Sequence, residues 1–476
     1  MRKILLTIAS ALVCARGLCE ARFPKPDFTS GYQYPEITHG VPMEQLWNVV
    51  DVVLLVAMMS GVVWAAYRRR SRAVIYSTSI ISVLYFGFFR SGCVCSIGSI
   101  QNVTLALTDP SYHLPWYVIL IFLLPIVFTL LFGRVFCAGV CPLGALQELI
   151  NVRNLRISKA VAATLGIIPW VYLAFTILYA ATRSQFLICR FDPFVGIFRL
   201  GGDLGIIVFG IALLVMSVFV GRPFCQYLCP YGAVLSIFAS LSYKKLGITD
   251  KTCINCGLCI RSCPVDAIRT PQKSKMKEAR MTGVKRIIVF AILLPLFTIA
   301  GAFLVGKNSD ALSKAHKSVY LYELISEVRG ERLGVRVKGK VESGKRGQET
   351  LNSTPSTLTS NPSTLTSPPS TLTYLEVETF NAQGRSIEEL KTEVDIIKHQ
   401  YSIYSYLAGA LIGFVIGFKL LKLSLKRSRN TYEIDSARCT MCGKCFEYCP
   451  QREKEINVAS PPALPRREGA GTRKAY

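Results

Sequence analysis

The sequence predicts a mainly α-helical, polytopic membrane protein, and three observations support this fold class. Hydrophobic residues make up 51% of the 476 residues, and the mean hydropathy is +0.37, well above the level of a soluble enzyme. Apolar stretches of membrane-spanning length recur along the chain. Lys and Arg gather on one side of these stretches, as the positive-inside rule requires of cytoplasmic loops. The formal charge of +25 is therefore explained by orientation in a membrane, and we expect no nucleic-acid partner.

Seven spans are expected, with the N-terminus outside the cytoplasm and the C-terminus inside it. The spans cover about residues 47–67, 73–90, 116–133, 161–181, 204–221, 286–305 and 404–421. Arg68–Arg70 follow the first span and Lys422 follows the seventh, which marks both of these span ends as cytoplasmic.

The segments outside the spans are predicted from composition. Arg2 and Lys3 before the apolar stretch Ile4–Val13 indicate a signal peptide, with an uncleaved anchor as the alternative. Three Pro-Ser-Thr-Leu-Thr repeats within residues 354–373 predict a low-complexity linker. The expected boundaries are 1–21 for the signal peptide or N-terminal anchor, 22–46 for a periplasmic segment, 47–242 for a membrane domain with a duplicated turn, 243–283 and 422–458 for the two halves of a cytoplasmic domain, 284–305 and 404–421 for the sixth and seventh spans, 306–403 for a periplasmic excursion with the linker and a helix, and 459–476 for a disordered tail.

An apolar stripe at helical spacing precedes the seventh span. It comprises Ile387, Leu390, Val394, Ile397 and Tyr401. We expect one long helix that continues into the span. A homodimeric coiled coil through the stripe is the alternative, although the stripe covers only about two heptads.

Two cysteine runs carry the most specific chemical signal. Each has spacings of three, three and four residues and ends in Cys-Pro, which is the ligand pattern of bacterial ferredoxins. Zinc sites use paired Cys-x2-Cys arms and do not need the Cys-Pro ending. In two-cluster ferredoxins the fourth cysteine of each run ligates the other cluster. We therefore predict two [4Fe–4S] clusters, one held by Cys253, Cys256, Cys259 and Cys449, the other by Cys439, Cys442, Cys445 and Cys263. The two halves form one split, ferredoxin-like domain.

A duplicated turn indicates a third site. Gly133-Arg134-x-Phe136-Cys137-x3-Cys141-Pro142 recurs, at a constant offset of 88 residues, as Gly221-Arg222-x-Phe224-Cys225-x3-Cys229-Pro230. Both copies follow an inward span, so the repeats are parallel. Cysteines four apart share one face of a helix, and the repeat symmetry brings the two pairs together at the inner end of the spans. The two arginines favour thiolate formation.

The residues alone do not identify the metal that these turns would bind. Four sulfur ligands (Cys137, Cys141, Cys225 and Cys229) suit a third Fe–S cluster, copper or zinc. Simple packing of small buried residues is the alternative.

Three further cysteines lie in loops that the topology places outside the cytoplasm. They are Cys93, Cys95 and Cys189. A disulfide between Cys189 and one of the other two is expected there, either structural or redox-active, and a cofactor bound by these cysteines is a second interpretation. The four histidines lie outside the apolar spans, which argues against a haem held by membrane histidines.

The two Cys-x3-Cys-Pro turns and the two ferredoxin runs together resemble the membrane polyferredoxins related to NosR, NapH and CcoG. The resemblance covers most of residues 80–270 and 404–450. It implies an electron-transfer or maturation protein of the bacterial inner membrane. NosR-like members support periplasmic nitrous oxide reductase, NapH-like members pass quinol electrons toward periplasmic nitrate reductase, and CcoG-like members handle copper for oxidase assembly.

The chain also departs from these relatives. Residues 22–45 are too short for the flavin-binding domain of NosR, and the two runs are farther apart than in NapH-like chains. The expectation is an electron-transfer subunit rather than a complete enzyme, because no nucleotide-binding Gly-x-Gly-x-x-Gly or Walker motif occurs. It would pass electrons between a quinone or cytoplasmic donor and a membrane or periplasmic redox partner. A copper-handling, maturation or regulatory factor for a periplasmic metalloenzyme is the alternative.

Overall fold

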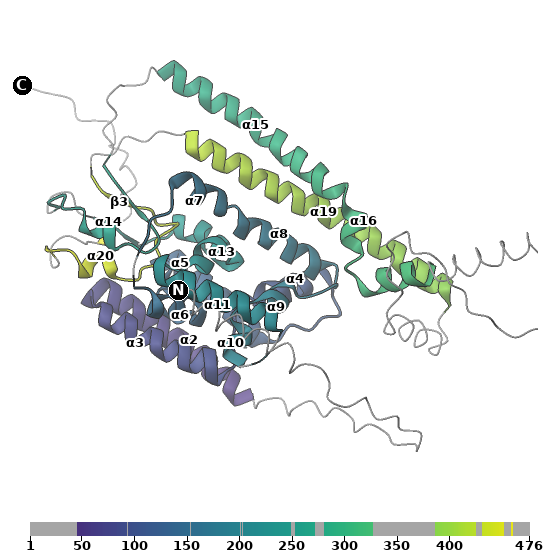
Figure 1. Ribbon diagram of the computed structural model, residues 1–476, viewed down its shortest axis with the longest axis horizontal. Coiled ribbons are helices and arrows are strands. Elements are labelled where there is room, and N and C mark those ends of the chain that lie inside the picture. The colour runs from purple at the N-terminus through teal and green to yellow at the C-terminus, as the bar shows by residue number, and fades with distance from the viewer. Residues whose placement is uncertain are drawn as a thin grey trace, which may run out of the picture. The chain divides into compact units, whose positions relative to one another are not determined.

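The computed structural model describes residues 45–92, 94–152, 154–199, 201, 203–248, 253–271, 280–326, 386–424, 431–451 and 458–459. Helices dominate, and the strands are short (Figure 1). In chain order the elements are α2 (Gln45–Trp64), η1 (Ala65–Arg69), α3 (Arg72–Ser82), η2 (Val83–Phe89), α4 (Ser99–Thr108), α5 (Trp116–Phe132), η3 (Phe136–Val140), α6 (Pro142–Ile150), α7 (Lys159–Leu165), α8 (Ile168–Ala181), α9 (Leu187–Phe191), α10 (Val195–Arg199), α11 (Leu204–Phe219), α12 (Pro223–Tyr227), α13 (Pro230–Ser240), β1 (Lys245–Leu246), α14 (Leu258–Ser262), β2 (Ile268–Arg269), α15 (Arg280–Gly306), α16 (Ser309–Ser313), α19 (Ile387–Ser424), β3 (Glu433–Ile434), α20 (Lys444–Glu447) and β4 (Val458–Ala459). The three η elements are π-helical turns.

The predicted fold class, a helical membrane protein, is confirmed. Five helices in the described part of the chain are long and apolar enough to cross a membrane: Gln45–Arg69, Arg72–Phe89, Ala160–Ala181, Ile288–Gly306 and Ile387–Lys422. The expected third and fifth spans are apolar but shorter, because α5 has 17 residues and α11 has 16. The count of seven spans therefore stays a prediction. The signal peptide, the linker and the tail after Ala459 lie outside the described residues, whereas Ala459 itself lies in β4.

The membrane domain repeats one order of elements. A long apolar helix, a short helical turn and a helix that begins at proline follow one another as α5, η3 and α6, and again as α11, α12 and α13. The segment that follows each copy of the repeat is hydrogen-bonded to the other copy. The Leu155 amide donates to the Phe219 carbonyl at 2.8 Å, and the Lys244 amide donates to the Leu131 carbonyl at 3.0 Å. Phe219 and Leu131 correspond to each other in the repeat, so the two halves hold each other reciprocally.

Helices α15 and α19 run side by side along their apolar lengths (Figure 1). Glycines allow this close approach. A Cβ on Gly413 would lie 2.1 Å from the Phe297 carbonyl oxygen, and one on Gly409 would lie 2.3 Å from that of Gly301. Such small-residue contacts hold helix pairs together in membranes, where the hydrophobic effect between helices is weak.

The apolar stripe before the seventh span is covered within the chain. Residues 387–424 form one helix, as predicted. Leu390, Val394 and Tyr401 are buried there in a core that also contains Leu178 of α8 and Val319. The stripe therefore does not require a second copy of the chain to bury it, and the homodimer stays untested.

Candidate metal centres

The two cysteine runs fold together into one small unit. Strand β2 after the first run pairs with β3 before the second, with Ile268 opposite Ile434. Strands β1 and β4 form a second antiparallel pair. An ion pair between Arg269 and Asp435 adds to the contact. Segments on either side of the α15–α19 helix pair thus assemble as two halves of a single domain.

Both runs make the same local turn. Gly257 and Gly443 follow the second cysteine of each run and have φ angles of 73° and 82°, in the left-handed region that glycine adopts at least cost. The helices α14 and α20 begin at the next residue and carry the third cysteine. The common geometry gathers the first three thiols of each run on one loop.

The fourth cysteine of the first run lies with the second run. Cys445 is within electrostatic range of Cys439, Cys442 and Cys263, and also of Cys259. Cys259 in turn is within range of Cys253 and Cys256. The structure therefore brings Cys263 to the three thiols with which the sequence paired it. Cys449 is half-buried.

Burial favours the protonated form of two thiols of the second run, Cys439 and Cys445. It raises the pKa of Cys439 to about 12 and that of Cys445 well above its ordinary value, with neighbouring thiols adding to the effect at Cys445. Because metals bind the thiolate form, iron must displace protons from these side chains.

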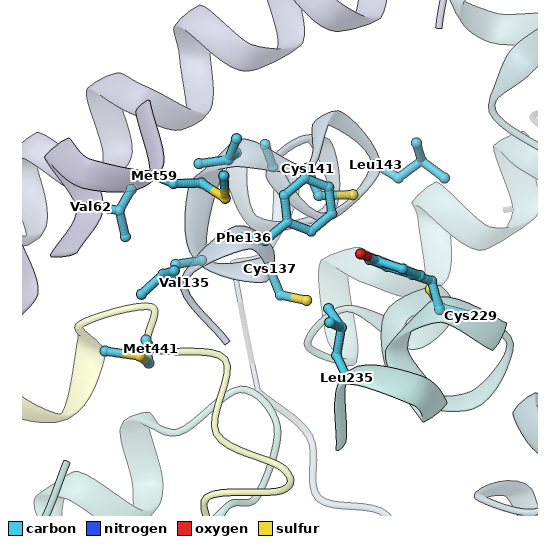
Figure 2. Packing of buried hydrophobic residues seen from close by; sticks show 14 of the residues in the cluster. Met59, Val62, Val135, Phe136, Cys137, Cys141, Leu143, Cys229, Leu235 and Met441 are labelled. Carbon is cyan, nitrogen blue, oxygen red and sulfur yellow. The ribbon is translucent and has the colours of Figure 1, made fainter. Parts of the chain in front are cut away.

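The four turn cysteines line one cavity. They are Cys137, Cys141, Cys225 and Cys229, and Phe136, Tyr231, Ile97 and other residues complete the lining. Figure 2 shows the sulfurs of Cys137 and Cys141 on the side of their turn that faces Cys229. We call this the four-cysteine cavity. Among the described residues that line it, none carries a carboxylate.

The donor set suits a multinuclear cluster. Four sulfurs are the ligands that Fe–S clusters use. Within the described residues, no three His, Cys, Asp or Glu side chains are arranged as ligands of a single metal ion.

The turns differ from the expected single helix face. Cys137 lies in η3, but Cys141 has extended backbone angles and precedes α6. Cys229 likewise precedes α13, and its Sγ accepts a hydrogen bond from the Gly232 amide at 3.2 Å. Pro142 and Pro230 begin the new helices, as the sequence predicted. Each pair of cysteines therefore flanks a break between two helices.

The cavity also lies deeper than expected, within the bundle rather than at the inner end of the spans. The carbonyl of Val140 accepts a hydrogen bond from Ser82, ten residues into the span that begins at Arg72. The Tyr231 hydroxyl donates to the carbonyl of Phe122 at 2.7 Å, near the start of α5. Ile97, from the loop before α4, completes the lining. The turns therefore re-enter the helix bundle.

The duplicated arginines lie between the cavity and the second run. Arg134 donates to the Ala437 carbonyl at 3.1 Å and approaches the Cys137 Sγ at 3.8 Å. Arg222 is fully buried, donates to the Cys137 and Ala138 carbonyls, and is within electrostatic range of both Cys225 and Cys442. Both arginines thus connect the cavity with the segment that carries the second run.

The arginines lower thiol pKa values less than burial raises them. At Cys225, burial raises the pKa to about 11, although Arg222 and Arg134 act in the opposite direction. The expected thiolates therefore do not form from arginine proximity alone, and metal binding has to supply the remaining driving force.

A buried carboxylate joins the same region, and sequence reasoning missed it. Glu148 Oε2 lies 3.1 Å from Arg222 Nε, and Glu148 Oε1 lies 3.0 Å from Nζ of Lys444 in the second run. Arg72 approaches Oε1 at 3.6 Å. Glu148 and Lys444 side chains are only 5% and 7% exposed. The sequence feature that could have identified Glu148 is its position as the one acidic residue in the apolar segment after Cys141.

Cys95 and Cys189 belong to a different face. The loops 90–115 and 182–203 meet through an ion pair between Arg183 and Asp109 at 3.2 Å. We call their common surface the loop face. Gln101 Nε2 approaches the Cys189 Sγ at 3.5 Å, and Cys95 is a free thiol, so the disulfide expected at Cys189 is not formed with Cys95. Cys93 lies outside the described residues.

Comparisons with known proteins identify families that match the segments carrying these cysteines. A family described as "4Fe-4S binding domain" matches residues 114–159 and 203–249, which contain the two turns, and a second family of the same description matches 248–269 and 432–452. An uncharacterised protein of Methanocaldococcus jannaschii, MJ0750, is 31% identical over 41% of this chain and 82% of its own length. No solved structure matches the chain.

Two relatives with names are also similar. The regulatory protein NosR of Pseudomonas aeruginosa is 32% identical over 41% of this chain and 30% of its own length. The ferredoxin-type protein NapH of Escherichia coli is 28% identical over 38% of this chain and 68% of its own length. The chain thus spans less than a third of NosR.

Proposed function

Because the chain belongs to the NosR/NapH-like family of 4Fe-4S membrane proteins, we propose that it conducts electrons through three iron–sulfur sites in series. Its role in iron–sulfur electron transfer follows from the family domains. The proposal adds the number of sites, their ligands and their order. When bound, [4Fe–4S] clusters accept and release single electrons.

The first two sites are those of the ferredoxin-like domain. Cys253, Cys256 and Cys259 with Cys449 would hold one cluster, and the thiols around Cys445 with Cys263 the other. Proximity of Cys259 to Cys445 supports electron exchange between the two sites. Cys256 is exposed, so the first site is the one that a soluble cytoplasmic donor reaches.

The third site is the four-cysteine cavity. The observation that carries the proposal is Arg222, which is fully buried and within range of both Cys442 of the second site and Cys225 of the cavity. The match of a 4Fe-4S family to both turns supports iron here over copper. From the cavity, electrons would pass to a membrane quinone or to a redox partner protein.

Metal content of the anaerobically purified protein tests the proposal. We expect about twelve irons and twelve acid-labile sulfides per chain. The variant Cys225→Ser would lower both numbers by about four, because the cavity loses a ligand, and the EPR signals of the other two clusters would persist. Cys189→Ser, a cysteine outside the cavity, is the matched control and would retain all twelve.

Two outcomes would overturn the three-site proposal. About eight irons with copper in the wild-type protein, and loss of that copper in Cys225→Ser, would establish the copper-handling alternative. About eight irons without any other metal, and no change in Cys225→Ser, would leave the cavity without a redox site.

A further inference from the structure

Two thiols outside the candidate metal centres approach each other at the loop face. Cys95 comes from the loop before α4 and Cys189 from α9, in the other half of the repeat. Both lie beside Gly98: the position of a Cβ on that residue is 3.7 Å from the Cys189 Sγ and 4.0 Å from the Cys95 Cβ. Cys95 and Cys189 are also within electrostatic range of each other.

The surroundings hold both side chains in place. Gln101 is 1% exposed, and its Oε1 accepts a hydrogen bond from the Ile188 amide at 2.7 Å while its Nε2 approaches the Cys189 Sγ. The Gly98 amide approaches the Cys95 Sγ at 3.4 Å. One buried glutamine therefore fixes α9 against the loop that carries the other thiol.

The two thiols differ in access. Cys189 is exposed, whereas Cys95 is half-buried. Burial, followed by the charge of Asp192, raises the pKa of Cys95 to about 12. An exposed thiol beside a more protected one is the usual arrangement of an attacking and a resolving cysteine.

A buried acid completes the group. Asp192 is 6% exposed, accepts a hydrogen bond from the Phe194 amide at 2.9 Å, and lies within electrostatic range of Cys95. Burial raises its pKa to about 6, so this carboxylate can take up and return a proton near neutral pH.

The thiols are also close to the four-cysteine cavity. Tyr172 of α8 is within electrostatic range of Cys95, Cys189 and, on the cavity side, Cys229. Tyr231, which lines the cavity, is within range of Cys95 as well. Each of these two aromatic side chains is thus within electrostatic range of a loop-face thiol and of a thiol of the cavity.

From this arrangement we propose that Cys95 and Cys189 form a redox-active dithiol that reduces disulfides of a partner at the loop face. The Cys189 thiolate attacks the partner disulfide, a new S–S bond to Cys189 forms, and the partner's released sulfur takes up a proton. Cys95 then transfers its proton to Asp192 and attacks the Cys189 sulfur. The bond to the partner breaks, its second sulfur takes the proton from Asp192, and a Cys95–Cys189 disulfide remains.

Restoring the dithiol requires two electrons and two protons. The inference rests on the proposed function for these electrons, because the iron–sulfur electron-transfer role of the chain is their source. The exchange half of the cycle does not need the metal sites, so it can be tested separately.

Oxidised glutathione serves as the disulfide probe, added anaerobically to the full chain in nanodiscs. After trapping with a maleimide, peptide mass spectrometry is expected to find a Cys95–Cys189 disulfide in the wild-type protein. Cys95→Ser would accumulate a mixed disulfide between Cys189 and glutathione at least tenfold above the wild-type level, because nothing resolves it. Asp192→Asn would slow formation of the Cys95–Cys189 disulfide by roughly 10- to 100-fold, as the loss of a positioned proton acceptor does.

Cys93→Ser is the control, and we expect it to behave like the wild-type protein. A Cys93–Cys189 disulfide in the wild-type protein, or no glutathione adduct at Cys189 in Cys95→Ser, would overturn the proposal. Loss of iron in Cys95→Ser or Cys189→Ser would also overturn it, since these thiols would then be cluster ligands. Failure of the three-site proposal would appear instead as low iron in the wild-type protein with normal disulfide exchange.

Discussion

Replacement of Glu148 by Gln is expected to loosen the second cysteine run from the membrane domain. Glu148 is the only carboxylate that the described residues place against both Arg222 and Lys444. Burial opposes its ionisation, but Arg222 and Lys444 outweigh this effect and its pKa lies below the ordinary value. The carboxylate is therefore charged at pH 7, and the amide of Gln would leave two buried cations without their counter-ion.

The size of the effect follows from burial. The Arg222, Glu148 and Lys444 side chains are 0%, 5% and 7% exposed. Removing one member of such a buried pair costs about 3–5 kcal/mol, because the remaining charge cannot reach water. At 1.4 kcal/mol for each factor of ten, the population of the detached run rises by roughly 100- to 4000-fold.

Hydrogen–deuterium exchange of the cluster-loaded protein measures this population, because amide exchange reports local opening. We expect faster exchange within residues 431–451 of Glu148→Gln. Glu447→Gln is the matched control. Glu447 also pairs with Arg72, at 2.5 Å, but its side chain is 40% exposed, and such pairs contribute about 0–1 kcal/mol.

Equal exchange rates in Glu148→Gln and Glu447→Gln would show that the buried Glu148 does not hold the second run to the membrane domain. A second variant separates lost attachment from general misfolding. Glu148→Gln combined with Lys444→Met removes one of the stranded cations, so its exchange is expected to be slower than that of Glu148→Gln alone. Additive effects of the two substitutions would mean that the side chains do not interact.

Three further predictions concern other parts of the chain. Cys263 lies in the first run, but its replacement by Ser is expected to remove about four irons and the EPR signal of the cluster at Cys445 in the second run. Loss of the EPR signal of the cluster at Cys253 instead would contradict the exchange of the fourth cysteines between the two runs. Gly413→Leu forces α15 and α19 apart, which we expect to cost about 1–3 kcal/mol in thermal denaturation of the detergent-solubilised protein. Gly61→Leu is its control, because a Cβ there meets nothing within 4 Å, and an equal loss in both would refute close packing. Reconstitution of metal-free protein with iron and sulfide is expected to release, beyond the protons that the added hydrogen sulfide itself loses, about one proton for each buried thiol such as Cys439 and Cys445, measured in a weakly buffered titration. Release of only the protons of the hydrogen sulfide would mean that these thiols were already ionised.

The sequence predicted what depends on local spacing. The ferredoxin runs follow from cysteine positions alone, and their common glycine turn follows from the residue after the second cysteine. The meeting of Cys137 and Cys225 was also predictable, because a duplicated segment packs about a pseudo-twofold axis. Hydropathy also located the five helices that are long and apolar enough to span a membrane.

Contacts between distant residues were not predictable in this way. Glu148 and Lys444 are 296 positions apart, and neither lies in a sequence motif that would predict their ion pair. The depth of the four-cysteine cavity was missed for a related reason. From sequence alone, a turn with apolar flanks is predicted to lie at the end of a span. Only contacts between distant residues, such as the hydrogen bond from Ser82 to the Val140 carbonyl, show that the turn re-enters the helix bundle.

The division of the ferredoxin-like domain by the α15–α19 helix pair has a consequence for biogenesis. During synthesis the first run emerges before α15, and the second emerges only after α19. If Cys263 and Cys449 complete the sites as proposed, neither cluster can be finished until both helices have been inserted and the chain has returned to the same side of the membrane. Cluster assembly would then depend on correct membrane topology. Chains whose synthesis ends before α19 would keep incomplete cysteine ligand sets and would be degraded.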